Sequence, residues 1–285
     1  MQIKTITTQK VLSPTQISLA DYVINPYKGC EFGCLYCYAQ ENKNIDKNIF
    51  FESLSVKINA PEILERELKY KKPKRVLLGS TTECFPAEEK KFKVTEKILK
   101  ILNAKNISYT ILTKSHLISD YLELIMQNPK NKIFFTLNFQ SDKLIRLFEQ
   151  KSSSLNQRLE TIGKIITAKI NLRIHIGPFI PYICDLEKIL KLLSEGVKEI
   201  DIELYHKKQG NFSQIIEVVI KNIGEDTSEQ LKTVYGSEKN YHEFIENLKT
   251  KSKSIDGYRD FMFYWIIPAF DQFYDQRINY FRPVN

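Results

Sequence analysis

The chain has 285 residues, of which 42% are hydrophobic and 27% charged, and this composition is typical of a globular protein and excludes a disordered or fibrous one. Its net charge of +8 favours polyanionic partners, but the lysines alternate with acids, so a Lys-rich solvated surface explains the charge as well. The longest apolar runs have about seven residues against the roughly 20 of a membrane span. Because the N-terminal residues also lack an apolar signal segment, we expect a cytoplasmic protein without a membrane partner.

The first predicted element is the loop NPYKGCEFGCLYCYAQ, residues 25–40, which holds three of the five cysteines. Cys30, Cys34 and Cys37 follow the spacing C-x3-C-x2-C. A disulfide scaffold would spread its cysteines over a short secreted chain. A structural zinc site needs four ligands, and none of the four histidines lies nearby, so Cys84 or Cys184 would have to complete it.

An iron–sulfur cluster explains this loop better than zinc does. A 4Fe–4S cluster normally takes four thiolates, so three of them leave one iron open for a substrate or cofactor. Gly29 and Gly33 precede the first two thiols and allow positive φ angles and a close approach of backbone to sulfur. We therefore predict that Cys30, Cys34 and Cys37 bind a 4Fe–4S cluster.

With an aromatic residue, Tyr36, before the last cysteine, the motif C-x3-C-x-aromatic-C resembles that of the radical S-adenosylmethionine (SAM) enzymes. The resemblance implies that SAM binds the open iron and that the reduced cluster cleaves it to a 5′-deoxyadenosyl radical, which abstracts hydrogen from a substrate. It also implies an electron donor such as flavodoxin or ferredoxin. The alternative is a non-catalytic iron–sulfur protein, which would bind metal without cleaving SAM.

The rest of the chain predicts alternating strands and helices. Short β-branched and aromatic runs indicate strands at 75–83, 108–115, 132–139, 171–180 and 199–205. Apolar residues at helical spacing indicate helices at 86–105, 152–169 and 185–196, the last beginning after Asp185 and ending at Gly196. Repeated β–α units predict an α/β fold with a parallel sheet. Their number and the resemblance favour a partial (β/α)6 TIM-type barrel of the radical SAM kind, with a mostly helical, aromatic-rich C-terminal extension.

Polar residues follow three of these strands, in the segments GSTTE, TKS and TLN. Each segment alone is typical of an ordinary turn or helix cap. In barrels of this kind the active residues lie at the carboxyl ends of the strands. Together, above a cysteine loop, the segments predict hydrogen-bond donors for a carboxylate and for ribose hydroxyls.

The order of NPYKGC, KINAPEIL, LGSTTE, LTKS and GPFIP, from about Leu12 to about Tyr205, is similar to the spore photoproduct lyase-like branch, also called DNA repair photolyase-like. The resemblance implies that SAM contacts Thr81, Lys114 and Thr136. Further residues carried over are Ser80 beside SAM, Tyr36 near its adenine, Tyr38 in a radical relay, and Glu149 and Arg158 as a pair across the barrel mouth.

The chain departs from this branch at Ser80, which stands where the lyase has a hydrogen-donating cysteine. A Ser O–H bond is too strong to quench a carbon radical usefully. The nearest thiol is Cys84, which is a candidate hydrogen donor or a small buried core residue. The substrate therefore stays open between a nucleic acid, favoured by likeness and charge, a peptide or protein, and a small molecule.

The resemblance fades after residue 205, so we expect two parts, with the clearest boundary signal at 207–213. Residues 1–205 form the radical SAM core barrel with its N-terminal cluster loop, and residues 206–285 form an extension that packs on or caps the barrel. The tail of this extension, from 257 to 285, mixes aromatic residues with arginines. Such a mixture can stack on nucleobases or simply cap an open barrel.

Overall fold

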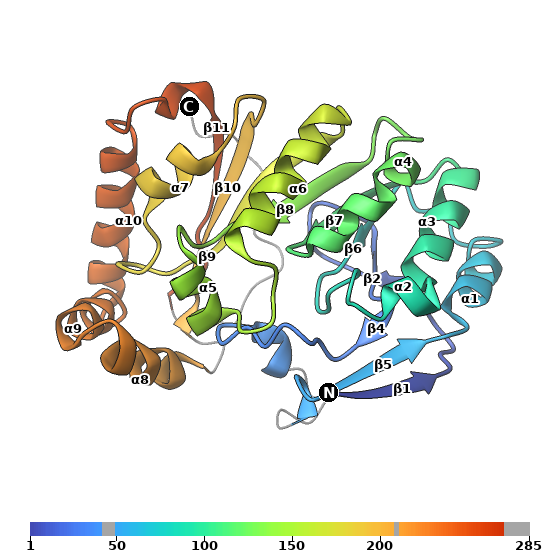
Figure 1. Ribbon diagram of the computed structural model, residues 1–285, viewed down its shortest axis with the longest axis horizontal. Helices are drawn as coiled ribbons and strands as arrows, with labels where there is room; N and C mark the ends of the chain where they lie inside the picture. Colours follow the sequence, from blue (N-terminus) through green and yellow to red (C-terminus); the bar gives the residue numbers. More distant parts are fainter. Residues whose placement is uncertain (42–48, 208–210, 271–285) are drawn as a thin grey trace.

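The structure, a computed structural model, describes residues 1–41, 49–207 and 211–270, and its centre is an eight-stranded sheet (Figure 1). From one edge to the other the strands are β11 (Met262–Ile266), β10 (Glu199–Leu204), β9 (Asn171–Phe179), β8 (Lys132–Thr136), β7 (Ser108–Thr113), β6 (Arg75–Leu78), β3 (Tyr22–Ile24) and β2 (Ser13–Pro14).

Neighbouring strands of this sheet pair in parallel, except for the short edge strand β2, which runs antiparallel to β3. The inner strands β7 and β8 are almost continuously buried, as strands covered on both faces are. The five strands expected from the sequence are confirmed as β6 to β10. The structure adds β3, next to β6, and β11, next to β10, so that seven strands are parallel, and it places β2 at the antiparallel edge.

Helices connect the parallel strands: α1 (Ala60–Glu67), α2 (Glu89–Phe92), α3 (Val94–Ala104), α4 (Leu122–Ile125), α5 (Asp142–Phe148), α6 (Leu155–Thr167) and α7 (Leu186–Leu192). Helix α6 begins with a capping box, in which the Ser154 side chain and the Gln157 side chain each bond the other's backbone. Helix α7 begins as expected at Asp185, whose carboxylate accepts a hydrogen bond from the Lys188 amide at 3.1 Å. The α/β fold predicted from the sequence is therefore confirmed.

Two predicted helices differ from the structure. The helix expected at 86–105 is divided at Lys93, whose φ of 51° is left-handed. This bend lets the Glu89 carboxylate accept the amides of Thr95 and Glu96, at 3.0 and 2.9 Å, and so cap α3. The helix expected to reach Gly196 ends at Leu192, because Leu193 is already extended and the chain turns toward β10.

A second, smaller sheet leads directly into the cysteine loop. It consists of β1 (Gln2–Ile6), β5 (Ser53–Lys57) and β4 (Tyr27–Lys28), in that order. Strand β4 ends two residues before Cys30, and the amide of Cys30 bonds the carbonyl of Phe50 at 3.1 Å. Gly29 has the expected positive φ, 84°, and a Cβ there would lie 2.1 Å from the carbonyl oxygen of Ser53. Only glycine therefore fits where the loop leaves this sheet.

The C-terminal segment contributes helices α8 (Phe212–Asn222), α9 (Glu225–Val234) and α10 (Glu238–Ser252), which are grouped beside the β10–β11 end of the sheet (Figure 1). Its strand β11 pairs in parallel with β10, so this segment also extends the sheet. Residues 271–285 of the aromatic tail and 208–210 of the expected boundary lie outside the described residues. Within the part of the chain that is described, no helix combines the length and apolarity needed to cross a bilayer.

The buried Glu67 of α1 joins the N-terminal segment to the barrel. Its carboxylate accepts the amides of Val11 and Leu12, at 2.9 and 2.7 Å, and pairs with Lys71. Burial alone would raise the pKa of Glu67, but the Leu12 amide, Lys71 and the Val11 amide together hold it below its ordinary value. A carboxyl group whose pKa is lowered by folding stabilises the protein at neutral pH, and this contribution is lost as the pH falls through the folded pKa.

We expect Glu67→Gln to lower the free energy of unfolding by about 1–3 kcal/mol at neutral pH, because two buried amides lose a charged acceptor. Urea denaturation of both proteins at neutral and at acidic pH measures this difference. The difference in unfolding free energy between the two proteins should become smaller at acidic pH, where Glu67 is protonated in both the folded and the unfolded state. The control is Glu65→Gln on the exposed face of the same helix, and a gap that stayed equal at both pH values would contradict the assignment.

Candidate active site

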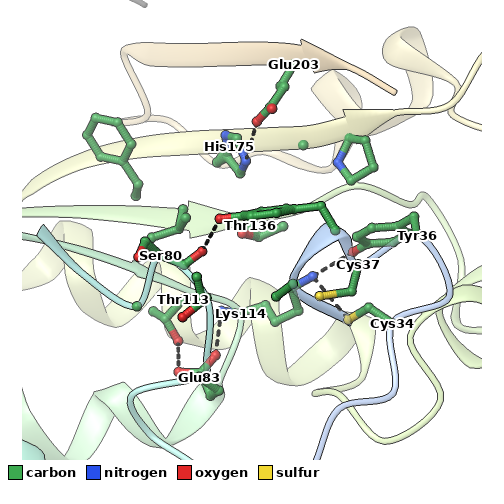
Figure 2. Close-up of a pocket in the computed structure, with 18 of the residues that line it drawn as sticks. Cys34, Tyr36, Cys37, Ser80, Glu83, Thr113, Lys114, Thr136, His175 and Glu203 are labelled. Atoms are coloured by element: carbon green, nitrogen blue, oxygen red, sulfur yellow. Dashed lines mark hydrogen bonds and ion pairs between the residues drawn. The ribbon is translucent and has the colours of Figure 1, made fainter. Parts of the chain in front are cut away.

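A cavity of about 330 Å³ lies at the carboxyl ends of the parallel strands, next to the cysteine loop (Figure 2). This volume is within the range of ligand pockets, roughly 300–1,000 Å³. Its lining includes nine of the residues expected from the sequence, namely Cys30, Cys34, Tyr36, Cys37, Tyr38, Ser80, Thr81, Lys114 and Thr136. The lining does not include Cys84, Glu149 or Arg158. The structure therefore brings together most of the predicted site.

The cysteine loop is held in place mainly through its backbone. The Cys37 amide bonds the Cys34 carbonyl at 3.0 Å, which closes a tight turn between these two thiols. The Leu35 amide bonds the carbonyl of Phe148 at 2.8 Å, and Cys34 forms a β-bridge with Glu149. The end of α5 thus fixes the orientation of the loop toward the cavity.

The three loop cysteines carry reduced thiols. Burial raises the pKa of Cys30, and it raises that of Cys34 to about 12 although Lys114 acts in the opposite direction. A metal bound here would therefore displace protons from the thiols. Three thiols on one loop facing a shared cavity suit a cluster with three protein ligands. In the described residues no three His, Cys, Asp or Glu side chains are arranged around a single-ion site.

Lys114, at the end of β7, reaches from the cavity to the cysteine loop. Its ammonium group lies 2.6 Å from the Tyr36 hydroxyl, 3.0 Å from Glu149 Oε1 and 3.6 Å from Cys34 Sγ. Burial alone would lower the pKa of Lys114, but Cys34 and Glu149 outweigh it and raise the pKa. Lys114 therefore stays positively charged beside the thiol of Cys34.

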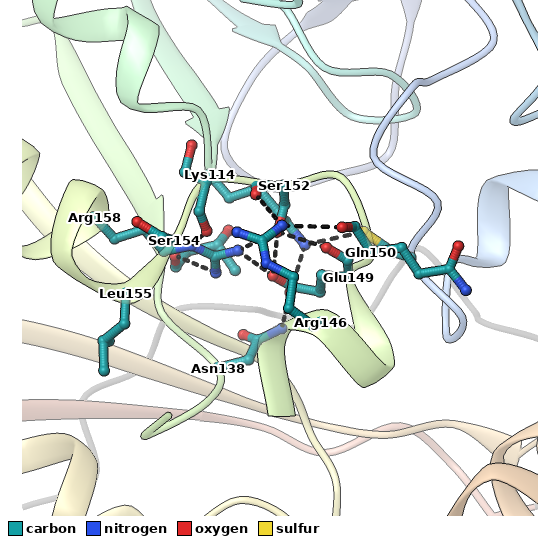
Figure 3. A network of polar contacts seen from close by, with 12 residues as sticks. Lys114, Asn138, Arg146, Glu149, Gln150, Ser152, Ser154, Leu155 and Arg158 are labelled. Atoms are coloured by element: carbon teal, nitrogen blue, oxygen red, sulfur yellow. Dashed lines mark hydrogen bonds and ion pairs between the residues drawn. The ribbon is translucent and has the colours of Figure 1, made fainter. Parts of the chain in front are cut away.

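Glu149 and Arg158 form the expected ion pair, but the pair is fully buried and does not line the cavity (Figure 3). Arg158 also donates to Ser152 Oγ at 2.6 Å and to the Ser153 carbonyl at 3.0 Å. Although burial acts to raise it, the charges of Arg158 and Lys114 lower the pKa of Glu149 to about 2. Two cations thus share one carboxylate beneath the cysteine loop.

Tyr36 and Asn138 complete this buried network, and Asn138 is the last residue of the TLN segment that the sequence analysis singled out. The Tyr36 hydroxyl donates to Glu149 and accepts from Asn138 Nδ2 at 2.8 Å. The Asn138 amide also exchanges two hydrogen bonds with the backbone of Gly177, at 2.7 and 2.9 Å. Asn138 therefore links the cysteine loop to β9 at Gly177.

The segment that follows β6 forms part of the cavity rim, and the side chains of Asn25 and Tyr38 hold it in place. Asn25 Nδ2 donates to Ser80 Oγ at 3.2 Å, and the Thr81 amide donates to Asn25 Oδ1 at 3.1 Å. Tyr38, which is about half exposed, donates from its hydroxyl to the Ser80 carbonyl. Tyr38 and Ser80 therefore join the cysteine loop to the carboxyl end of β6.

Cys84 lies apart from this rim. It is fully buried, and a Cβ on Gly79 would lie 3.2 Å from its sulfur. The hydroxyl of Thr95 bonds its carbonyl at 2.6 Å, which fixes the backbone between the rim and α3. These contacts favour the alternative in which Cys84 is a core residue.

Three further residues of the cavity wall were not indicated by the sequence analysis: His175 on β9 and Asp201 and Glu203 on β10. Polar residues at every second position of otherwise apolar strands were the available signal, because alternate residues of a strand face the same side. Backbone pairing then aligns Thr136, His175 and Asp201 in one row across β8, β9 and β10. This row therefore makes the cavity wall formed by β8, β9 and β10 polar.

Comparisons with known proteins agree with this geometry. The family model of the radical SAM superfamily matches residues 24–193. An uncharacterised protein of Methanocaldococcus jannaschii is 31% identical over 191 residues, which cover 67% of this chain and 72% of that protein. A spore photoproduct lyase of Clostridium acetobutylicum is 24% identical over 195 residues, which cover 65% of this chain and 56% of the lyase.

Solved structures of spore photoproduct lyase share the fold. One mutant of it matches with a TM-score of 0.59 and 20% identity, over 77% of this chain and 66% of the lyase. Another mutant, with bound AdoMet and dinucleoside spore photoproduct, matches with a TM-score of 0.53 and 19% identity, over 78% of this chain and 65% of the lyase. The matched family model covers more than half of the chain and includes the cysteine loop and the cavity-lining ends of β6 to β9. The chain therefore belongs to the radical SAM superfamily of enzymes.

Proposed function

We propose that this chain binds a 4Fe–4S cluster through Cys30, Cys34 and Cys37, binds SAM in the adjoining cavity, and abstracts a hydrogen atom from a substrate there. The observation that supports this most directly is that three thiols of one loop and the polar strand ends line the same cavity. When bound, the reduced cluster and SAM supply a 5′-deoxyadenosyl radical, and the protein supplies binding, orientation and shielding.

The charged residues at the cysteine loop have two different roles in this proposal. Lys114 carries a positive charge into the cavity and is the group that we assign to the carboxylate of SAM. Glu149 and Arg158 do not reach the cavity, so we assign them to holding Lys114 and Tyr36 in place. Tyr36 accordingly supports the loop through its hydroxyl. In addition, we assign its ring to a contact with the adenine of SAM.

The hydroxyl groups of the strand ends are the donors and acceptors that we assign to the remaining polar atoms of SAM, and they belong to Ser80, Thr81 and Thr136. Tyr38 extends over the same rim, and we propose that it contacts the reacting region or relays a radical. Apolar side chains surround these groups, among them Phe32, Leu77 and Phe134. Such a lining excludes water, which protects a radical from side reactions.

For the substrate, we propose a nucleic acid. The likeness to spore photoproduct lyase, one structure of which contains a dinucleoside spore photoproduct, and the net charge of +8 support this proposal. Ser80 lines the cavity where the lyase resemblance would place a hydrogen-donating thiol, and Cys84 is enclosed in the core. The product radical therefore needs another hydrogen donor than in the lyase. A peptide or protein substrate is the alternative.

The same proposal includes the organisation of the chain and its partners. Residues 1–205 would carry the cluster and SAM, and residues 206–285 would form an extension that packs on or caps the barrel. A flavodoxin or ferredoxin would donate the electron. Cysteines that hold a cluster must stay reduced, which suits a reducing compartment, so we place the protein in the cytoplasm.

The proposed reaction is tested by reconstituting the full chain anaerobically with iron and sulfide and adding SAM and dithionite, with and without UV-irradiated DNA. We expect 5′-deoxyadenosine to form and thymine lesions in the DNA to decrease. Cleavage of SAM with unchanged DNA would retain the radical SAM reaction and reject the nucleic-acid substrate. A protein that binds iron but forms no 5′-deoxyadenosine would be the non-catalytic alternative.

Replacing Cys30, Cys34 and Cys37 by alanine should abolish both the iron–sulfur absorption and the formation of 5′-deoxyadenosine, because no thiolate would be left to hold iron. Visible absorption and chromatography of the nucleoside measure the two effects. The matched control is Cys184→Ala, a buried cysteine outside the cavity lining, which should retain both. Persistent SAM cleavage in the triple variant would refute the ligand assignment.

Glu149→Gln should lower both the stability of the protein and the amount of iron that it binds. The change leaves Arg158 and Lys114 without their shared carboxylate, and breaking a buried ion pair costs about 3–5 kcal/mol. Urea denaturation and iron content per chain after reconstitution measure the effects. Glu160→Gln, on the exposed face of α6, is the control. A Glu149 variant with the same stability and the same iron content as this control would contradict the proposed support of the loop.

A further inference from the structure

The wall of the cavity formed by β9 and β10 carries a polar group that the proposed cofactor site does not use. Figure 2 shows His175 and Glu203 across the cavity from Cys34 and Lys114. Together with Asp201 they form a row, in which His175 lies between the two carboxylates. We name these three residues the acidic wall.

His175 is fixed in this row from three sides. Its Nδ1 lies 2.9 Å from Asp201 Oδ2, and its Nε2 lies 3.6 Å from Glu203 Oε2. A Cβ on Gly177 would lie 2.0 Å from Nε2, so the imidazole ring occupies the space that any other residue at 177 would need. Asn138 in turn holds the backbone of Gly177. The ring therefore has one defined position.

The groups of the acidic wall shift each other's pKa values. Burial opposes protonation of His175, but Asp201 and Glu203 outweigh it and raise the pKa of the imidazole. Burial raises the pKa of Glu203, His175 acts against this, and the charge of Asp201 adds to the rise. The imidazole thus hydrogen-bonds Asp201 through Nδ1, and its Nε2 lies within ion-pair distance of the carboxylate of Glu203. All three residues line the cavity, and Glu203, whose side chain is about one quarter exposed, is the most accessible of them.

The surroundings of Glu203 limit what it can bind. Leu204 follows Glu203 in β10 and Ile266 is its partner in β11, and both also line the cavity, so this part of it suits a flat, largely apolar ring. An ionised carboxylate only accepts hydrogen bonds, so its partner must be an N–H or O–H donor. A phosphate group would be repelled by this wall. A nucleobase has the required shape and presents N–H donors on its edge.

We infer that Glu203, oriented by His175 and Asp201, selects the substrate by accepting a hydrogen bond from the N–H edge of a base that enters the cavity. This inference rests on the proposed nucleic-acid substrate and adds the residue that reads it. Enzymes that act on a base within a pocket read it by hydrogen bonds to this edge.

The test compares two probes, the dinucleotide thymidylyl-thymidine and its analogue methylated at N3 of both bases, which lacks the N–H donors. Binding of each is measured by calorimetry to the anaerobically reconstituted full chain with SAM and without reductant. In the wild type we expect the methylated probe to bind about tenfold more weakly or worse, because a buried acceptor is left without its partner. This comparison needs no variant and is independent of any folding defect.

Glu203→Leu, which removes the acceptor at similar volume, should bind both probes alike, and His175→Gln should reduce the discrimination partly. Glu217→Leu on the exposed face of α8 is the control and should discriminate as the wild type does. Equal binding of the two probes by the wild type, or discrimination that persists without Glu203, would overturn the inference. So would binding of N-acetyl-lysine amide, but of neither dinucleotide, at this site.

A loss of SAM affinity in Glu203→Leu as large as the loss for the dinucleotide would also overturn the inference, because Glu203 would then contact the cofactor. The proposed radical SAM reaction is measured separately, through 5′-deoxyadenosine formed by the wild type under dithionite. A wild type that forms this product but does not discriminate between the probes rejects only the role of Glu203.

Discussion

The carboxylate of Glu149, buried between Arg158 and Lys114, is the interaction on which the arrangement of the site depends. A buried ion that loses its partner costs several kcal/mol, so these groups are constrained to stay together. They come from the end of α5, from α6 and from the end of β7, and Tyr36 joins them from the cysteine loop. One buried charge thereby sets the distance between the loop and the barrel.

A consequence of this arrangement is a cavity with two different walls. On the side of the cysteines, Lys114 brings a positive charge to the thiol of Cys34. On the side of β9 and β10, the row of Asp201, His175 and Glu203 brings carboxylates. Asn138 connects the two, because it bonds both Tyr36 and Gly177. A ligand with an anionic and a hydrogen-donating end would therefore have one favoured orientation, and positioning of this kind is a large part of catalysis.

The likeness to spore photoproduct lyase is a likeness of fold, and the differences lie where the chemistry would be decided. A hydroxyl at Ser80 faces the cavity, while the thiol of Cys84 lies in the core behind Gly79. The proposed cofactor site could thus be combined with a different way of quenching a product radical. The substrate contacts and the hydrogen donor, more than the cluster loop, would distinguish this chain from its relatives.

Local patterns predicted much of this protein. The three cysteines lie within eight residues, so their shared role needs no knowledge of the fold, and the apolar runs predicted β6 to β10 because side-chain periodicity is a local property. The burial of Glu149 with Arg158, the enclosure of Cys84 and the row of Thr136, His175 and Asp201 depend on which strands are neighbours and in which register. Register follows from the packing of the whole sheet, and a polar residue in one strand does not reveal its partner in the next. Only the tertiary structure therefore decided which polar residues hold the loop, which face the cavity and which lie in the core.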